Sequence, residues 1–489
     1  MNRFFAYFIV ASAAVAMTLT SCSSKPEDSG TEPASDNRSL ELTLSSAQLG
    51  WEGGSFSLQV KANFEYRVEI GADWIASDGN VSDSDMTKYF VAEANPYNQE
   101  RSAEIRVIDV NDRYFFKSVT VTQDLNPAKR LEISIVDKNA TAETKALLAN
   151  LFLVGEKGFM FGHHDDLWYG RYWYNEQGRS DTKDVCGDYP AVFSVDFGEI
   201  TDNRHNNGEN QIRRRVCIEA YERGEVILAV MHLNNPQTGG DAWDNSNKEV
   251  VKNILTEGHS TRAKYLSWLD HLADFANNLR DSNGTLIPVI LRPYHEHTQW
   301  WSWWSQQCTT EQEFISLWRM TIKYLRDTKG VHNFLYAISP QMDSWYSESE
   351  ASGRIVFRWP GDEWVDFMGI DCYHGENPAA MNLYLNALES WAEQKNKPCG
   401  VTEDGRESFT TANFWSKEVL EPLRGRRSCM CVMWRNKYVG NNESDKHFYS
   451  VYPGHPSQED FVKMYNDPES LFSRDLPDMY AMPDNCVIK

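Results

Sequence analysis

The chain has 489 residues, and its formal net charge at pH 7 is −22. This length is enough for a large core plus a smaller module. The acidic balance excludes a nucleic-acid partner, because such proteins need a basic surface, and we attribute the acidity to solubility. Seventeen Trp and 22 Tyr residues supply many flat side chains that combine an apolar face with a polar group.

The first residues have the pattern of a secretory signal. Arg3 precedes the apolar stretch FFAYFIVASAAVAMTL, which is short and close to the terminus for a membrane span. The stretch ends in Leu19-Thr20-Ser21-Cys22, which resembles a bacterial lipoprotein cleavage box. We therefore predict a signal peptide over residues 1–21, lipidation of Cys22, and export to the outer membrane with an acyl anchor there.

Two segments follow the signal before the pattern of the main domain begins. Residues 22–38 are polar and rich in Ser and Pro, which predicts a flexible tether. Over residues 39–126 apolar and polar side chains alternate, as in Phe56, Leu58 and Val60, and turn residues separate the runs. This alternation predicts a small all-β sandwich of the immunoglobulin-like type.

Part of this sandwich resembles a known module. The segment Asp73-Trp74-Ile75 and the closing VTVTQD are similar to the BACON domain, which is found beside secreted carbohydrate-active domains. We interpret Trp74 as a core residue and the module as a spacer. The alternative is that Trp74 forms a sugar-binding platform.

Residues 130–489 have a different pattern, in which short apolar runs alternate with longer segments of helical spacing. Near-continuous apolar strands between helices are typical of a parallel sheet covered by helices. Eight such units predict a (β/α)8 TIM barrel. The runs are KGFMFGH near residue 157, AVFSVDF at 191, VILAVMH at 226, LIPVILRPYHE at 286, FLYAISPQ at 334, DFMGIDCYH at 366, KPCGVTED at 397 and CMCVMWRN at 429.

Nearly every predicted strand ends in a side chain that is typical of a functional site. In a barrel these ends share one rim, where active sites lie. Polar caps at solvent would explain any one of them, but Trp and His are not typical caps. The residues are His163, Asp196, His232, Glu296, Gln341, Asp371 with Tyr373, Glu403 and Trp434.

Glu296 and Glu403 end the fourth and seventh strands, so both can reach one cleft. Hydrolysis of a glycosidic bond needs one carboxylic acid to protonate the leaving oxygen and one carboxylate to attack or to activate water. Glu296 lies among aromatic residues, whose desolvation would favour its protonated form. Taken alone, either Glu is equally explained as a helix cap or a surface charge. We expect Arg292 to be an internal ion-pair partner near the acid.

The segment RPYHEHTQWWSWW resembles the acid/base motif of glycoside hydrolase family 26, and GVTEDG resembles the nucleophile strand of that family. FGHHDDLWYG, MHLNNP, GIDCYH and VMWRN are similar to its first, third, sixth and eighth strands. The likeness runs in order over residues 130–470. It departs from the family pattern at Gln299-Trp300, Ser302 and Ser305, which affects the expected shape of the sugar-binding subsites.

The resemblance implies hydrolysis with retention, with Glu296 as acid/base and Glu403 as nucleophile. It also implies that a set of neighbouring residues binds the substrate. His295, Asp371 and Tyr373 would orient the nucleophile and the sugar, and His232, Trp301 and Trp434 would line the subsite on the non-reducing side. From the first strand, His163 and His164 are the candidates for a subsite role.

No cofactor and no metal are predicted. Consecutive strand residues point to opposite faces, so His163-His164-Asp165-Asp166 cannot easily surround one ion. Cys429 and Cys431 are better explained as small buried side chains than as zinc ligands. The remaining cysteines are scattered and imply no disulfide framework.

The sequence thus predicts a lipid-anchored endo-β-1,4-mannanase whose partner is a polysaccharide, namely mannan, glucomannan or galactomannan. We expect a monomer. Three alternatives stay open: a β-1,3-xylanase or a mixed-linkage glucanase on the same scaffold, and a non-catalytic lipoprotein that captures glycans in a Trp-rich cleft.

Overall fold

The computed structural model describes residues 37–77, 86–126, 131–202, 207–342, 346–373, 377–440, 442 and 444–489. Cys22, the predicted signal peptide and most of the predicted tether lie outside these residues. Two compact units are present, one extending to Asn95 and including Arg101–Asp124, the other formed by Pro96–Glu100 and Leu125–Lys489. Among the described helices, none has the length and apolar composition needed to cross a bilayer.

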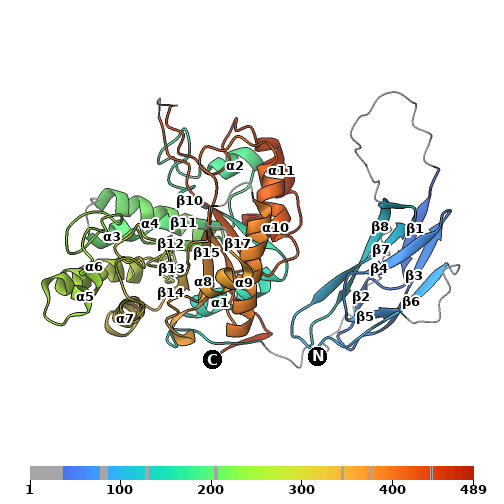
Figure 1. Cartoon of the computed structure of the whole chain (residues 1–489), viewed down its shortest axis with the longest axis horizontal. Helices are drawn as coiled ribbons and strands as arrows, with labels where there is room; N and C mark the ends of the chain where they lie inside the picture. Colours follow the sequence, from blue (N-terminus) through green and yellow to red (C-terminus); the bar gives the residue numbers. More distant parts are fainter. Residues whose placement is uncertain are drawn as a thin grey trace, which may run out of the picture. The chain divides into compact units, whose positions relative to one another are not determined.

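The N-terminal unit consists of two four-stranded sheets around one apolar core, which confirms the all-β prediction for this region (Figure 1). Trp74 is only 9% exposed and belongs to this core, with the Arg101 guanidinium 4.3 Å from its ring centroid. The interpretation of Trp74 as a core residue is therefore confirmed. In sheet order the strands are β1 (Leu40–Leu44), β3 (Gly54–Ala62), β6 (Thr87–Ala92) and β5 (Ile75–Ser77), then β2 (Gln48–Leu49), β8 (Asp112–Gln123), β7 (Arg101–Asp109) and β4 (Tyr66–Ile70).

The C-terminal unit contains a closed barrel. Within the described part of the chain, eight parallel strands pair in sequence order, and β10 pairs with both β11 and β17 to close the ring. This confirms the predicted (β/α)8 fold. The strands are β10 (Phe159–His164), β11 (Val192–Asp196), β12 (Val226–Val230), β13 (Val289–Arg292), β14 (Phe334–Ile338), β15 (Phe367–Cys372), β16 (Cys399–Asp404) and β17 (Met430–Met433).

Helices and short additional strands surround the barrel (Figure 1). The short strand β18 (Ser470–Leu471) pairs with β10, and β9 (Leu131–Ile133) pairs with β19 (Cys486–Ile488). The α-helices are α1 (Ala142–Gly155), α2 (Asp181–Cys186), α3 (Gly198–Asp202), α4 (Asn207–Glu222), α5 (Val250–Leu255), α6 (Ser260–Asn277), α7 (Glu311–Lys323), α8 (Glu348–Ile355), α9 (Pro378–Lys395), α10 (Glu421–Leu423) and α11 (Gln458–Tyr465). Shorter π- and 3₁₀-helices are η1 (Tyr324–Thr328), η2 (Asp362–Trp364), η3 (Trp415–Leu420) and η4 (Ser473–Asp475).

Alternate residues of the barrel strands belong to different parts of the core. Leu228 of β12, Ile290 of β13 and Leu335 of β14 share one buried cluster with Val432 of β17, so these side chains meet inside the ring. Ile227, next to Leu228, instead packs in the cluster formed with the outer helices. Because both faces are covered, the strands are continuously apolar rather than alternating.

We predict that Gly162 in β10 tolerates no side chain. An added Cβ would lie 2.7 Å from Val432 Cγ2 and 3.0 Å from Val192 Cβ, inside a packed barrel. G162A should therefore lower the free energy of unfolding by about 1–3 kcal/mol, as overpacking does. The matched control is G353A in α8, where no atom lies within 4 Å of an added Cβ and Ala favours the helix. Equal unfolding midpoints for the two variants would contradict the prediction.

Candidate active site

The inner faces of the barrel strands lead to one rim. Every second side chain of β12 faces the barrel interior. Leu228 faces inward, so His232, four residues further along, also faces inward. By the same rule His164 and Arg292, at the ends of β10 and β13, also face inward. These side chains therefore converge at the C-terminal end of the barrel, where the active sites of this fold lie.

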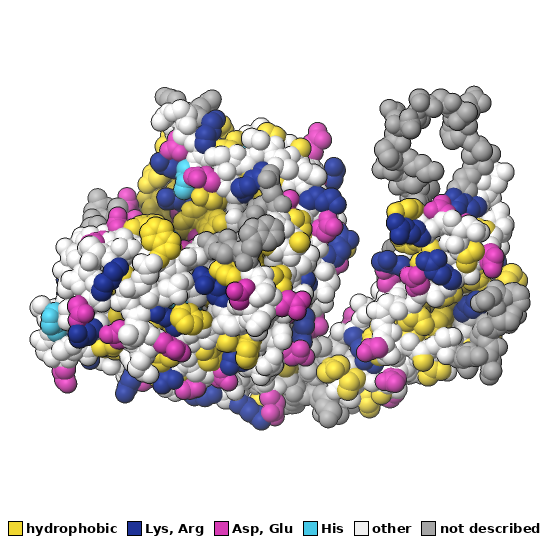
Figure 2. All heavy atoms as spheres, in the orientation of Figure 1, with side chains coloured by type: hydrophobic (Ala, Val, Ile, Leu, Met, Phe, Trp, Pro, Cys, Tyr) yellow, Lys and Arg dark blue, Asp and Glu magenta, His cyan; other side chains and the backbone are white. Residues whose placement is uncertain are grey.

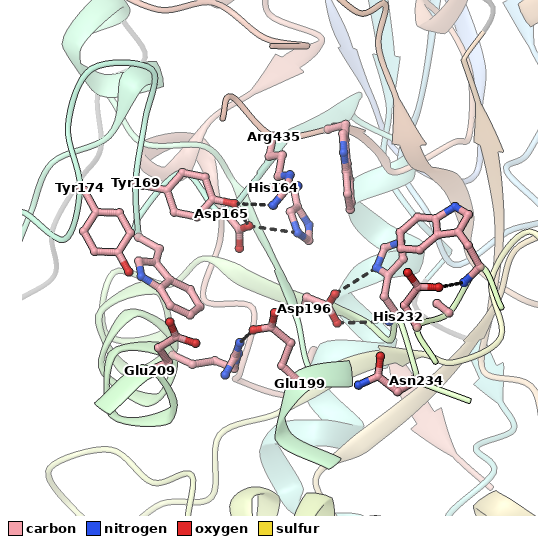
Figure 3. A pocket seen from close by; sticks show the side chains of 16 residues that line it. His164, Asp165, Tyr169, Tyr174, Asp196, Glu199, Glu209, His232, Asn234 and Arg435 are labelled. Atoms are coloured by element: carbon pink, nitrogen blue, oxygen red, sulfur yellow. Dashed lines mark hydrogen bonds and ion pairs between the residues drawn. The ribbon is translucent and has the colours of Figure 1, made fainter. Parts of the chain in front are cut away.

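A cavity of about 410 Å³ opens at this rim (Figure 3). Four residues that the sequence analysis selected, His164, Asp196, His232 and Trp434, line it. Figure 2 shows apolar side chains gathered around a hollow in the barrel unit. The cavity is therefore a cleft with aromatic walls and polar groups between them.

Glu403 is held by two donors from different strands. Arg292 Nη2, from β13, donates to Glu403 Oε2, and the Tyr373 hydroxyl, from the end of β15, donates to Oε1. A β-bulge explains why Glu403 reaches the interior: Ile370 pairs with Val401, but the next residue of β15, Asp371, pairs with Glu403. The bulge thus shifts the register by one residue and directs Glu403 toward Arg292.

Asp371 shares the same guanidinium. Arg292 Nη1 donates to Asp371 Oδ2, and Thr402 Oγ1 donates to Asp371 Oδ1 over 2.8 Å. Burial opposes the charge of Arg292, but Asp371 and Glu403 outweigh it and raise the pKa of the guanidinium. Arg292 is completely buried, so the prediction that it forms an internal ion pair is confirmed.

Glu296 has a different environment, although it faces the same group of charges. It is 7% exposed, and Trp301 Nε1 donates to its Oε2 over 2.5 Å. Burial raises the pKa of Glu296 well above its ordinary value, and the charges of Glu403 and Asp371 raise it further. The raised pKa favours the protonated form of Glu296, which is the form that an acid catalyst requires.

The chain is bent sharply where Glu296 enters the cleft. Tyr294 has a φ angle of 52° and Glu296 one of 53°, in the left-handed region that side chains rarely adopt. The Glu296 N–H donates to the Ser339 carbonyl over 2.8 Å, which anchors this backbone to the end of β14. Such conformations persist only where surrounding contacts hold them, and they concentrate at functional sites.

The histidines of the rim lie close together. The ring centroids of His232 and His295 are 4.5 Å apart. His232 Nδ1 lies 3.0 Å from Asp196 Oδ2 (Figure 3). Burial lowers the pKa values of His295 and His164 well below the ordinary value. For Asp196, burial favours the protonated form, but His232 and the Gly198 N–H reverse this and lower the pKa. The uncharged imidazoles of His164 and His295 suit contact with a neutral ligand.

Aromatic rings form the walls on both sides of His232. His164 stacks on Trp434 with ring centroids 4.1 Å apart, and Trp243 stacks on Trp301 at 5.2 Å. Trp243 is 56% exposed, so it presents its ring to the solvent side of the cleft. Exposed indole faces of this kind are suited to stacking against sugar rings.

The structure separates the two candidate histidines of β10. His163 faces away from the cavity, and its Nδ1 lies 3.1 Å from Asp166 Oδ1 and 3.4 Å from Thr182 Oγ1. Of these two histidines, only His164 therefore lines the cleft, because neighbouring strand residues point to opposite faces, and substrate binding by His163 stays a prediction.

Several cleft residues were not selected from the sequence. Tyr169, Trp243 and Arg435 line the cavity, and Arg435 Nη1 donates to the Tyr169 hydroxyl over 3.1 Å. Tyr169 lies in the motif FGHHDDLWYG and Arg435 in VMWRN. These two motifs were therefore the sequence features that could have pointed to them. Trp243 lies in a loop with no regular pattern, where an exposed Trp is the only signal.

No cluster of three or more His, Cys, Asp or Glu side chains suited to a metal occurs in the described ranges. The cysteines from Cys186 to Cys486 are all free thiols. Cys429 and Cys431 are buried in two different core clusters, and burial raises the pKa of both thiols well above the ordinary value.

A TIM barrel whose rim brings a protonated and a paired carboxyl group together under stacked indoles has the site of a glycoside hydrolase. The comparisons agree. The sequence profile of Glycosyl hydrolase family 26 matches residues 136–406. The structure of a GH26 β-mannanase from Bacteroides ovatus is 38% identical with a TM-score of 0.66, covering 70% of this chain and 98% of that chain. The chain therefore belongs to glycosyl hydrolase family 26.

Two further relatives extend the likeness. The structure of GH26C from a Muricauda species is 30% identical with a TM-score of 0.64, covering 71% of this chain and 96% of that one. A mannan endo-1,4-beta-mannosidase of Bifidobacterium adolescentis is 29% identical over 368 residues. That match covers 70% of this chain and 36% of the relative's length. The chain spans 55% and 59% of the lengths of two other curated relatives.

We predict that E296Q stabilises the protein and that the gain grows with pH. The folded pKa of Glu296 lies above its unfolded value, so wild-type stability is lost as the pH rises toward the folded pKa. Gln does not ionise and should add about 0.5–2 kcal/mol at alkaline pH. Thermal unfolding of both proteins from acidic to alkaline pH measures this. The exposed E257Q is the control, and a gain that shrinks as the pH rises would contradict the prediction.

Proposed function

We propose that this protein is a retaining endo-β-1,4-mannanase, with Glu296 as acid/base and Glu403 as nucleophile. The proposal rests on one observation: two carboxyl groups at the same rim have different surroundings. Burial keeps Glu296 protonated, whereas Arg292 and Tyr373 donate to the two oxygens of Glu403. The relatives named above as β-mannanase or mannan endo-1,4-beta-mannosidase support the choice of substrate.

In the proposed reaction Glu403 attacks the anomeric carbon while Glu296 donates its proton to the departing glycosidic oxygen. The bond from the anomeric carbon to that oxygen breaks, and a glycosyl ester on Glu403 forms. Glu296, now a carboxylate, removes a proton from water, which attacks the anomeric carbon and releases Glu403. Two displacements leave the configuration unchanged.

The surroundings of Glu403 support its role as the attacking group. Arg292 and Tyr373 stabilise the ionised carboxylate, and Asp371 balances the second arm of the guanidinium. Because both partners come from other strands, the carboxylate is held in place before substrate arrives. Such preorganisation is how active sites stabilise charge without reorganising during the reaction.

The cleft supports a neutral polysaccharide as substrate. His164, His232, Trp301 and Trp434 would bind the sugar on the non-reducing side, with His295 beside the acid. Among the described residues, Asp165 Oδ1 and Trp168 Nε1 are buried at the cavity without a hydrogen-bond partner. Buried polar groups are normally satisfied, so sugar hydroxyls would complete these bonds. We infer mannan, glucomannan or galactomannan as the polysaccharide.

We predict that the wild-type protein releases reducing ends from mannan and that E403A lowers kcat by about 10⁴-fold or more, because no group remains to form the ester. Parallel assays on β-1,3-xylan and mixed-linkage glucan identify the preferred substrate. Tight mannan binding without products from the wild-type protein would support the capture function instead. The control is E407Q, a neighbouring exposed Glu that pairs with His447.

We also propose that the protein is a lipoprotein of the outer membrane, anchored through Cys22, with the N-terminal sandwich as a spacer of the BACON type. The supporting features are the apolar leader and the cleavage box of the sequence. The burial of Trp74 supports a spacer rather than a sugar platform, because no ring face is left for a ligand.

For the anchor, we predict that C22S shifts the protein from the membrane fraction to the soluble fraction, because an acyl chain contributes about 0.8 kcal/mol per buried CH₂ and the variant has none. Cell fractionation and metabolic labelling with a fatty-acid analogue measure the change. C186S serves as the control cysteine. Equal membrane association and labelling of wild type and C22S would contradict the anchor.

A further inference from the structure

Tyr449 contacts the catalytic centre from a segment that the family profile does not match. The profile ends at residue 406, whereas Tyr449 lies in the long segment that follows β17. Its ring centroid is 5.6 Å from that of Tyr373, and the rings are inclined at 71°, an edge-to-face contact. Tyr373 in turn donates its hydroxyl proton to Glu403. A chain of two contacts therefore connects Tyr449 to the proposed nucleophile.

Hydrogen bonds hold the backbone of Tyr449 against the end of β17. Its N–H donates to Asn436 Oδ1 over 3.2 Å, and the N–H of Ser450 donates to the same oxygen over 3.0 Å. Asn436 is buried, and its amide group donates to Asp181 Oδ2 and to the Val451 carbonyl, both over 3.0 Å. The side-chain amide of Asn436 therefore fixes the point from which the Tyr449 ring projects.

The segment after Glu403 is shaped to receive this ring. Gly405 has a φ angle of +131°, and an added Cβ would lie 3.0 Å from both Cβ and Cδ1 of Tyr449. The Ser408 N–H donates to the carbonyl of Phe448, the residue before Tyr449, over 2.9 Å. This bond joins the segment after Glu403 to the segment that carries Tyr449. Glycine at position 405 thus lets the backbone next to the nucleophile lie directly on the Tyr449 ring.

The polar surroundings of Tyr449 keep it neutral. Its pKa is raised to about 12 by burial, with Glu407 and Glu403 adding to the shift. The His447 ring lies 5.3 Å away, and its Nδ1 is 2.7 Å from Glu407 Oε1. At neutral pH the ring therefore adds no charge next to Glu403, and its effect comes through packing.

We propose that Tyr449 is a positioning residue: it holds the Tyr373 ring so that the Tyr373 hydroxyl stays on Glu403. This inference rests on the proposed function, because it concerns the rate at which Glu403 attacks. Tyr373 directly follows β15, and its ring makes the edge contact with Tyr449 while its hydroxyl donates to Glu403. Without the edge contact the Tyr373 ring gains rotational freedom and Glu403 loses a fixed donor.

The test compares Tyr449→Ala with Tyr449→Phe on an aryl β-mannobioside and on mannotetraose. Y449A should lower kcat by about 10-fold with KM within about 3-fold, because the ring acts on the attacking group rather than on substrate affinity. Y449F keeps the edge contact and should restore kcat to within about 2-fold of wild type. Y452A is the matched control: it removes a ring three residues away that packs on Tyr172, Phe448 and His455.

A double-mutant cycle separates positioning from general destabilisation. Y373F already lacks the hydroxyl, so adding Y449A to it should change kcat by less than about 2-fold if Tyr449 acts through Tyr373. If Y449A fails to fold, G405A replaces it, because the added methyl group displaces the same ring. Additive losses in the cycle, a loss in KM alone, or equal effects of Y449A and Y452A would each overturn the proposal. Wild type measured on the same substrates tests the proposed function separately.

Discussion

The arrangement of the whole site depends on one buried guanidinium. Arg292, on the inner face of β13, binds Asp371 on β15 and Glu403 on β16, so one side chain connects three strands across the barrel interior. Removing either partner would leave a buried charge unpaired. An unpaired guanidinium or an unpaired carboxylate at this position would each destabilise the fold by several kcal/mol. The ion pairs therefore fix the bulge in β16, the direction of Glu403 and the charge that Glu296 faces.

The different states of the two glutamates follow from this arrangement. Arg292 and Tyr373 donate to the two oxygens of Glu403, whereas the indole N–H of Trp301 donates to Glu296. Burial and the nearby charges of Glu403 and Asp371 both raise the pKa of Glu296. Two identical side chains thus have different surroundings at one rim, and Trp301, which donates to Glu296, also stacks on Trp243 in the wall of the cleft.

Much of this was predictable from local patterns in the sequence. Each barrel strand was visible as an apolar run, because strands covered on both faces have no reason to alternate. The rim residues followed, since parallel strands in a barrel all end at one side. Asp196, His232, Glu296, Asp371, Tyr373, Glu403 and Trp434 were selected in this way, and the structure brings them to one cleft or to its immediate border. His163 was selected with them, because the sequence of a strand does not show which of two adjacent residues faces the barrel interior. His164 was selected only from the resemblance to the family.

By itself the sequence determined the class of fold, the order of its strands and the residue types at the rim, because these depend on hydrophobic period and on the chemistry of single side chains. The partners of those side chains were decided only by the tertiary structure. Tyr449 is 76 residues from Tyr373 in the chain, and the register shift that turns Glu403 toward Arg292 arises from pairing between strands. Contacts of this kind form only when the barrel closes. They join segments that are far apart in the chain, and nothing in the local sequence of either segment indicates the contact.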